Sequence, residues 1–264
     1  DEIIGFGLSD LSFFRQVVTM IKSLPSPFFA FLVTLTSHNP YDIPGELHGI
    51  KLLPEHEGTL FGNYLQSVHY TDKALGVFIS DLKHVGLYEN SIVAIYGDHS
   101  GLYPFNKENR DIMTGVLGKT YDLVQAMNIP LVFHIPGSRL KVVSSIAGGQ
   151  IDFFPTLLNL IGVVEKNGIL FGRDLNNSSG GFVSLTHYVP EGSFIDDGRI
   201  FIMSGDGILE NSIAIDRTTG ETIPSFSCLD GYKDSIQQIE ASKYLILNDS
   251  ISQLLGQATS TNTN

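Results

Sequence analysis

Apolar positions along the first two-thirds of this chain alternate between two spacings, one typical of amphipathic helices and one typical of buried strands. Ser9 and Asp10 offer N-caps for a first helix, whose apolar residues recur at three- and four-residue steps: Leu11, Phe14, Val18 and Ile21. A β-branched and aromatic run over 28–36 then predicts a buried strand. Because helix and strand patterns keep alternating, the sequence predicts an α/β fold with a mostly parallel sheet and helices on both faces.

The clearest helix runs from Tyr64 to Val85 and carries an acid on its predicted apolar stripe. The stripe consists of Leu65, Val68, Leu75, Ile79 and Leu82. Asp72 falls on the same stripe, and an acid on a buried face needs a partner. We therefore expect Asp72 to be held in a structural role by backbone donors, His or Arg, with a direct catalytic role as the alternative.

Further strands are predicted over 92–96 and 129–135, and a helix over 152–161. The pattern changes near Gly180, after which short apolar segments alternate with turn pairs as far as Ile223. That arrangement predicts an antiparallel meander.

Helical character returns after the meander, over 229–255. We accordingly expect three parts. They are an α/β core over 1–180, a small antiparallel subdomain with a helix over 181–256, and a disordered polar tail over 257–264.

Composition narrows the classes of partner. The chain has 264 residues and a formal net charge of −12, which argues against nucleic acid and against an anionic membrane surface. Cys228 is the only cysteine, so no internal disulfide forms. No apolar run approaches the roughly 18 to 20 residues that span a bilayer, and we expect the chain itself to be soluble. It opens on Asp1 without Met or a basic segment, like a cut inside a longer protein.

An acid and a histidine follow directly on the predicted strand 92–96. After Gly97 come Asp98 and His99, and ligands gather at the carboxyl ends of strands in open α/β sheets. A carboxylate oxygen and an imidazole nitrogen suit a divalent metal ion. The alternative is a turn in which Asp98 caps the next segment and His99 is solvated. His38 lies just past the strand 28–36, so the fold can bring it to the same edge.

Several common catalytic motifs are missing from the sequence. There is no HExxH, no GxSxG and no paired cysteine ligands, which leaves zincin and serine-hydrolase functions without support. The stretch 115–120 ends like a phosphate-binding P-loop, but Met113 stands where that loop needs its first glycine. We reject nucleotide binding there.

Five segments, taken in order, resemble one known family. They are PFFAFLVTLTSHNPY, YLQSVHYTDKALGVFISDLKHVGLYENSIVAIYGDHSG, IPLVFHIPG, GGQIDFFPTLLNLIGV and LFGRDL. Together they resemble the lipoteichoic acid synthase-like phosphoglycerol transferases of the sulfatase and alkaline phosphatase superfamily. The resemblance covers roughly Gly5 to Leu175, and the later meander and helix look like the family's small C-terminal subdomain.

The resemblance implies an activity and a set of site residues. Members are membrane-anchored bacterial proteins with an outward-facing catalytic domain. They transfer glycerol phosphate from phosphatidylglycerol through a covalent phosphothreonine, with bound Mn²⁺ or Mg²⁺. Asp98 and His99 match the metal ligands of the family's G-D-H motif, and His38 matches the histidine that contacts the phosphoglycerol head group. The product expected is a glycerol-phosphate polymer or a decorated cell-envelope glycan.

One departure from the family pattern limits this implication. The family's threonine nucleophile and a further acidic ligand lie upstream of the segments matched here. Thr34 and Thr36 belong to a later strand and do not match the nucleophile. We therefore expect the chain alone to be inactive and to bind metal weakly or not at all. Its expected partner is the N-terminal part of the same protein with its membrane anchor, at the extracellular or periplasmic face.

Two alternatives stay open at this stage. One is a sulfatase or phosphatase relative with a different ester substrate. The other is a non-catalytic binding module on the same fold. The identity of the upstream nucleophile distinguishes them.

Overall fold

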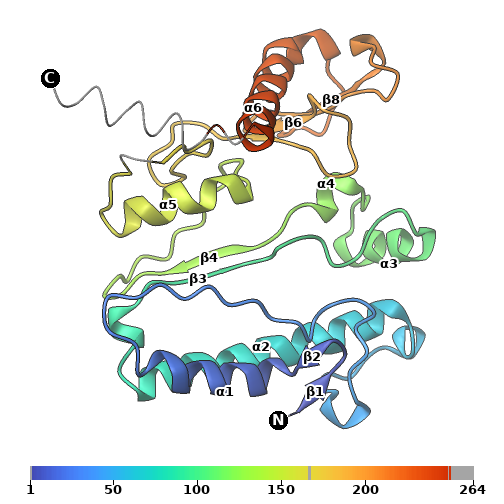
Figure 1. Ribbon diagram of the computed structural model, residues 1–264. Helices are drawn as coiled ribbons and strands as arrows, with labels where there is room; N and C mark the ends of the chain where they lie inside the picture. The colour runs from blue at the N-terminus through green and yellow to red at the C-terminus, as the bar shows by residue number, and fades with distance from the viewer. Residues whose placement is uncertain (1, 166–167, 249, 251–264) are drawn as a thin grey trace, which may run out of the picture. The chain divides into compact units, whose positions relative to one another are not determined.

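The computed structural model describes residues 2–165, 168–248 and 250, and divides the chain into two compact units, residues 1–140 and 141–264 (Figure 1). The domain boundary expected at residue 180 rests on the change in sequence pattern and stays a prediction. The expected tail 257–264 lies outside the described residues.

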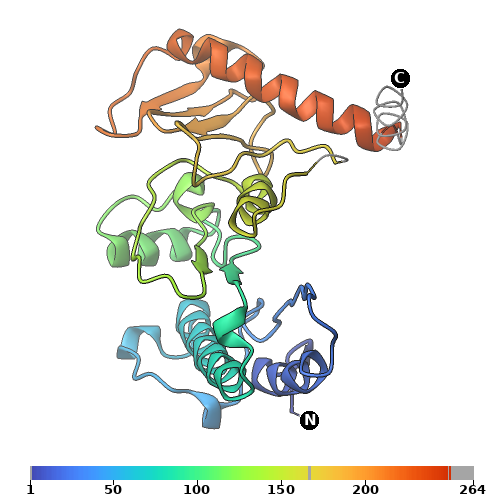
Figure 2. The same ribbon diagram turned by 90° about the vertical axis from the view of Figure 1, so that its left-hand side faces the viewer.

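Two long helices form the core of the first unit. A short hairpin of β1 (Ile3–Ile4) and β2 (Gly7–Leu8) leads into α1 (Asp10–Ile21). The helix α2 (Leu60–His84) lies beside α1 in both Figures 1 and 2. Their shared core consists of Phe14, Val17, Val18, Ile21, Ala74, Phe78 and Leu82. Ser9 caps α1 by accepting from the Ser12 amide at 3.2 Å, so the predicted first helix and its cap are confirmed.

The buried face of α2 differs from the predicted stripe. It runs through Tyr70, Ala74, Phe78 and Leu82, whereas Asp72 is exposed. Two residues along a helix rotate a side chain by about 200°, so a stripe that begins at Tyr70 turns Asp72 to solvent. The expectation of a buried, partnered Asp72 is therefore wrong.

The strands β3 (Val93–Tyr96) and β4 (Leu131–His134) form an antiparallel pair, with Val93 opposite His134. Between them lie α3 (Lys107–Leu117) and α4 (Leu123–Ala126). Figure 1 shows both helices at the end where β3 stops and β4 starts. The chain therefore returns beside β3 without crossing the sheet. Every strand pair among the described residues is antiparallel, which corrects the expectation of a mostly parallel sheet.

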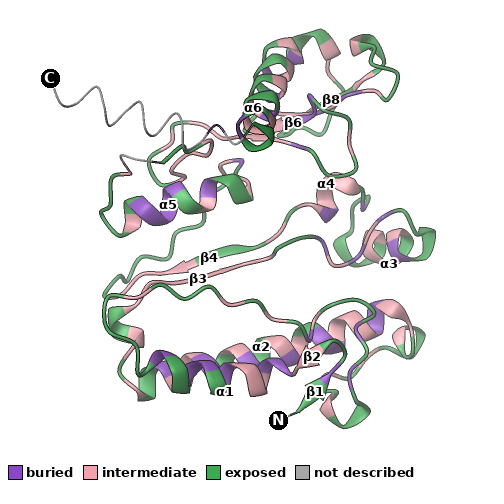
Figure 3. Ribbon diagram, in the orientation of Figure 1, coloured by how far each residue is buried: buried purple, intermediate pink, exposed green. Residues whose placement is uncertain are grey.

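The segment 28–36, predicted to be a buried strand, joins no β-ladder within the part of the chain that the structure describes. Phe28 and Leu32 pack against the core of α1 and α2. The alternate side chains are exposed by 72%, 62%, 55% and 39% at Phe29, Phe31, Val33 and Leu35. Residues 28–35 are exposed or intermediate (Figure 3), and Thr36 at the end of the segment is buried. The prediction was wrong because the described residues cover only one face of this segment.

The second unit contains the predicted meander. Four strands are paired in chain order: β5 (Phe182–Ser184), β6 (Phe194–Asp196), β7 (Arg199–Ile202) and β8 (Ile213–Asp216). Two helices accompany them, α5 (Phe153–Leu160) and α6 (Leu229–Leu247). The antiparallel subdomain with a helix is confirmed.

The core of this unit requires α6 to approach β6 closely. Phe194, Phe201 and Cys228 are fully buried. A Cβ atom added to Gly231 would lie 2.3 Å from Cζ of Phe194, so only glycine fits at this point of the helix.

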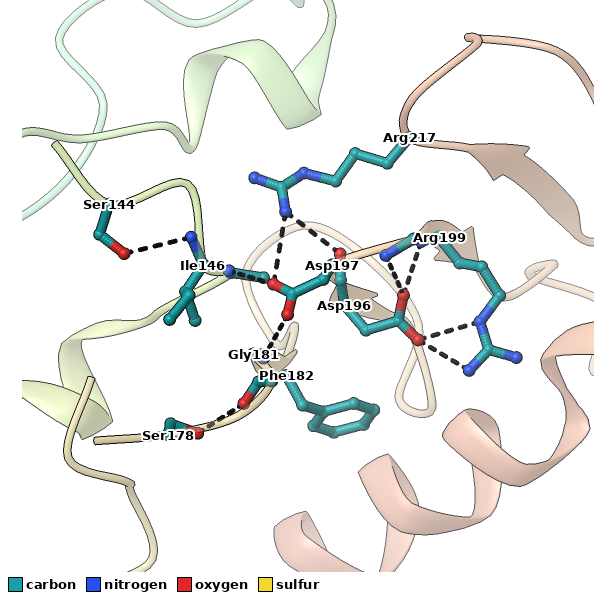
Figure 4. Close-up of polar contacts among 12 residues, drawn as sticks. Ser144, Ile146, Ser178, Gly181, Phe182, Asp196, Asp197, Arg199 and Arg217 are labelled. Atoms are coloured by element: carbon teal, nitrogen blue, oxygen red, sulfur yellow. Dashed lines mark hydrogen bonds and ion pairs between the residues drawn. The ribbon is translucent and has the colours of Figure 1, made fainter. Parts of the chain in front are cut away.

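An acidic turn between β6 and β7 connects distant loops of the second unit (Figure 4). The carboxylate of Asp197 accepts from the amides of Ala147 at 2.7 Å and Gly181 at 2.8 Å. These hydrogen bonds, that of Ala147 first, lower the pKa of Asp197, and Arg217 adds an ion-pair contact at 3.8 Å. Since both short partners are backbone amides, Asp197 has a structural role.

Six short 3₁₀ helices complete the described structure: Gly45–Leu47, Pro54–His56, Tyr88–Asn90, Gln150–Asp152, Leu209–Asn211 and Ser225–Cys228. None of the helices among the described residues has the length and apolar character needed to cross a membrane.

Candidate functional site

Asp98 and His99 lie immediately beyond the carboxyl end of β3. The amide of Gly97 donates to the carbonyl of Pro130 at 3.1 Å and so holds the end of β3 against the residue before β4. The Asp98 carboxylate accepts from the amide of His99 at 2.9 Å. Its other oxygen lies 3.6 Å from His99 Nε2. The two side chains therefore converge, and both are substantially exposed.

Backbone contact orients the His99 ring. Its Nδ1 lies 2.9 Å from the carbonyl oxygen of Ser100. Because a carbonyl only accepts, Nδ1 carries a proton in this contact, and in the neutral ring Nε2 is then the nitrogen with a lone pair for a ligand. Metal-ligating histidines commonly donate their second ring N–H in this way.

Asp98 and His99 together form only part of a metal site. The convergent carboxylate oxygen and imidazole nitrogen suit a divalent cation, but they supply only two ligands. In the described ranges, 2–165, 168–248 and 250, no group of three or more His, Cys, Asp or Glu side chains is arranged to hold a metal ion. The arrangement accordingly needs ligands from water, substrate or another segment.

The turn that carries His38 is attached to α1 by a buried acid. Asp10, which is 1% exposed, accepts from the amides of Leu35 and Thr36, each at 3.0 Å. Thr71 of α2 donates to its second oxygen at 2.6 Å. The sequence identified Asp10 only as a possible cap, because nothing local indicates its contacts with residues about 25 positions away.

His38 lies close to His99 despite a separation of about sixty residues in sequence. The ring centroids are 6.3 Å apart and the rings are nearly perpendicular. His38 Nδ1 lies 2.7 Å from the carbonyl oxygen of Asn39, so Nε2 is the nitrogen that can meet a ligand. The exposed ring of Phe6 lies edge-on to His38, with centroids 5.1 Å apart. All three residues singled out from the sequence are thus brought to one place.

Tyrosine hydroxyls hold the backbone that follows His99. Tyr41 donates to the carbonyl of Gly101, and Tyr121 donates to the carbonyl of Leu102 at 2.5 Å. Burial raises the pKa of Tyr41 to about 12, and it also raises the pKa of Tyr121. Both hydroxyls therefore keep the proton that they donate. Neither tyrosine stands out in the sequence, although Tyr41 lies three positions after His38.

Comparison with known proteins gives a consistent set of relatives. The sulfatase family profile matches residues 5–163. The lipoteichoic acid synthase-like protein YvgJ of Bacillus subtilis is 34% identical over 94% of this chain and 38% of its own length. Lipoteichoic acid synthase 1 of the same organism is 36% identical over 66% of this chain and 27% of its own length. The chain thus spans well under half of the curated relatives it matches.

Solved structures agree with the sequence matches. The lipoteichoic acid synthase LtaP from Listeria monocytogenes superposes with a TM-score of 0.83 at 28% identity, over 94% of this chain and 62% of LtaP. An alkaline phosphatase superfamily protein from Vibrio parahaemolyticus gives a TM-score of 0.66 at 21% identity, over 96% of this chain and 57% of that one. The expected alkaline phosphatase/sulfatase-like fold is confirmed.

Proposed function

We propose, from the premise that this chain belongs to the sulfatase family, that it is part of a phosphoglycerol transferase-type domain acting on phosphatidylglycerol. The observation that carries the proposal is the convergence of His38 with Asp98 and His99 at the end of β3. The relatives named lipoteichoic acid synthase support the choice of substrate class.

Each site residue has a role that follows from its hydrogen bonds. Asp98 and His99 would hold one face of a Mn²⁺ or Mg²⁺ ion through a carboxylate oxygen and Nε2. Such an ion supplies charge neutralisation at phosphoryl oxygens and lowers the pKa of a bound hydroxyl. Nε2 of His38 is the ring nitrogen left for a ligand, and in this proposal its protonated form donates to a phosphate or glycerol oxygen.

The N-terminal part of the same protein completes the site in this proposal. It supplies the threonine nucleophile and a further acidic ligand, and carries the membrane anchor at the extracellular or periplasmic face. An unpaired apolar row supports this part of the proposal. Phe29, Phe31 and Val33 are all more than half exposed along 28–36, a segment that joins no ladder among the described residues. A strand and a helix from elsewhere in the protein would cover such a row.

The test is an assay of diacylglycerol release from phosphatidylglycerol vesicles with Mn²⁺, using a longer form of the protein that includes the preceding segment. We expect His38→Ala and Asp98→Asn each to reduce kcat by about 100-fold or more, because each removes a group that meets the reacting phosphate or its ion. Asp72→Asn is the matched control, since Asp72 is an exposed acid on α2, and it should leave turnover unchanged.

Two results would contradict the proposal. Unchanged turnover in His38→Ala would remove His38 from the site. Hydrolysis of a sulfate ester by the longer form, without release of diacylglycerol, would favour the sulfatase alternative.

A further inference from the structure

Two separate loops carry the candidate site, and one residue bonds to both of them. The His38 turn follows the segment 28–36, whereas Asp98 and His99 follow β3. The amide of Tyr41 donates to the carbonyl of His38 at 2.9 Å and closes the turn around that histidine. The hydroxyl of the same residue donates to the carbonyl of Gly101, two residues after His99.

The backbone of Tyr41 indicates that its side chain is held in place. Its φ is 63°, in the left-handed region that bulky residues rarely adopt, and this conformation persists only where surrounding contacts outweigh its cost. Those contacts are present, because Tyr41 is 3% exposed and packs with Phe61 and Leu102. The ring of Tyr64 from α2 lies edge-on to it, with centroids 5.1 Å apart.

The loop that receives the Tyr41 hydroxyl is closely confined. A Cβ atom on Gly101 would lie 2.5 Å from Cε2 of Tyr64, so glycine is required where the loop passes that ring. Tyr121 holds the next carbonyl, that of Leu102, but bonds to no part of the His38 turn that the structure describes. The hydrogen bonds of Tyr41 therefore bridge the two loops.

We propose that Tyr41 is a positioning residue that sets the separation and orientation of the His38 imidazole relative to Asp98 and His99. The inference rests on the proposed function, because it assumes that these side chains act on one phosphate ester. Tyr41 itself touches no reacting atom in this proposal. It acts by holding one carbonyl in each loop.

The first experiment uses the 264-residue chain and no activity. Imidazole proton and carbon shifts of His38 and His99 are recorded at one fixed pH, assigned with His38→Gln and His99→Gln, and compared with those of Tyr41→Phe. We expect Tyr41→Phe to shift or broaden both imidazoles. Tyr70→Phe is the matched control, because it removes another buried tyrosine hydroxyl, bonded to Glu2 at 2.9 Å, and should change neither.

A second variant changes the loop that accepts the hydrogen bond from the Tyr41 hydroxyl. Gly101→Ala displaces the loop from Tyr64 and introduces no substitution in the His38 turn. If Tyr41 couples the loops, this variant changes the His38 resonances as well as those of His99. A response confined to His99, or a folded Tyr41→Phe with an unchanged His38, would overturn the inference.

The final arm separates positioning from the proposed function. In the longer form of the protein, Tyr41→Phe should lower kcat for diacylglycerol release by about ten- to 100-fold while KM changes little, because misplaced groups affect the reacting geometry more than binding. A rise in KM of similar size with kcat unchanged would count against a positioning role. Absence of turnover in the unmutated longer form would refute the proposed function, and the imidazole shifts would still decide the role of Tyr41.

Discussion

A tyrosine hydroxyl that donates to a carbonyl must keep its proton, and burial favours this state at Tyr41. The raised pKa, about 12 against an ordinary 10.0, means that the folded state binds this proton more tightly than the unfolded state. The resulting contribution to stability is complete below pH 10 and is lost as the pH rises toward 12. Since burial also raises the pKa of Tyr64 and Tyr121, the whole cluster should lose stability in this alkaline range.

The measurement is the ultraviolet absorbance of tyrosinate during an alkaline titration. We expect Tyr41, Tyr64 and Tyr121 to ionise late in the titration, together with loss of structure by circular dichroism. Tyr41→Phe should remove a phenol from this late phase. A late phase of unchanged amplitude in Tyr41→Phe would show that the Tyr41 hydroxyl is solvated.

Among single residues, those that could bind metal or substrate are easier to predict from the sequence than those that hold them in place. His38, Asp98 and His99 stood out because each follows an apolar run that ends abruptly. Asp10 and Tyr41 did not stand out, because their roles depend on partners 26 and 60 positions away that no local pattern indicates. The metal-binding and substrate-binding roles themselves stay predictions.

Two glycines inside helices should respond to alanine in opposite directions. Gly231 of α6 faces Phe194, and a Cβ there would lie 2.3 Å from the ring. Gly231→Ala should therefore destabilise the second unit by about 1–3 kcal/mol through overpacking. Gly76 of α2 has no atom within 4 Å of an added Cβ, so Gly76→Ala should stabilise the first unit by about 0.5–1 kcal/mol.

Denaturant unfolding of the two variants checks this pair, with each serving as the control for the other. Equal effects of the same sign would mean that helix propensity alone decides both positions, and that α6 does not approach β6 as closely as described.

Elements differed in how well the sequence predicted them. The helices α1 and α2 and the meander of the second unit follow from local periodicity and turn residues. The pairing of β3 with β4 does not, because strand direction depends on whether α3 and α4 cross the sheet or stay at one end. The face of α2 that is buried depends on where α1 packs, which placed Asp72 in solvent.

At the scale of the molecule, an apolar row lies exposed beside the candidate site. Phe29, Phe31, Val33 and Leu35 occupy alternate positions of 28–36 and end three residues before His38. Soluble proteins seldom leave contiguous apolar surface uncovered unless it has a partner. In the proposed function that partner is the preceding part of the same protein, so the row and the site should become complete together.

The corresponding prediction compares the chain with the longer form. The chain alone should bind a dye that fluoresces on exposed apolar surface, and the longer form should bind much less.

Phe31→Lys should lower dye binding by the chain, yet destabilise the longer form by about 2 kcal/mol or more, because it buries a charge there. Phe226→Lys is the matched control, since Phe226 is 58% exposed in the second unit, and it should leave the longer form unchanged. Equal tolerance of both substitutions in the longer form would mean that the row stays exposed, and that whatever supplies the nucleophile does not cover this face.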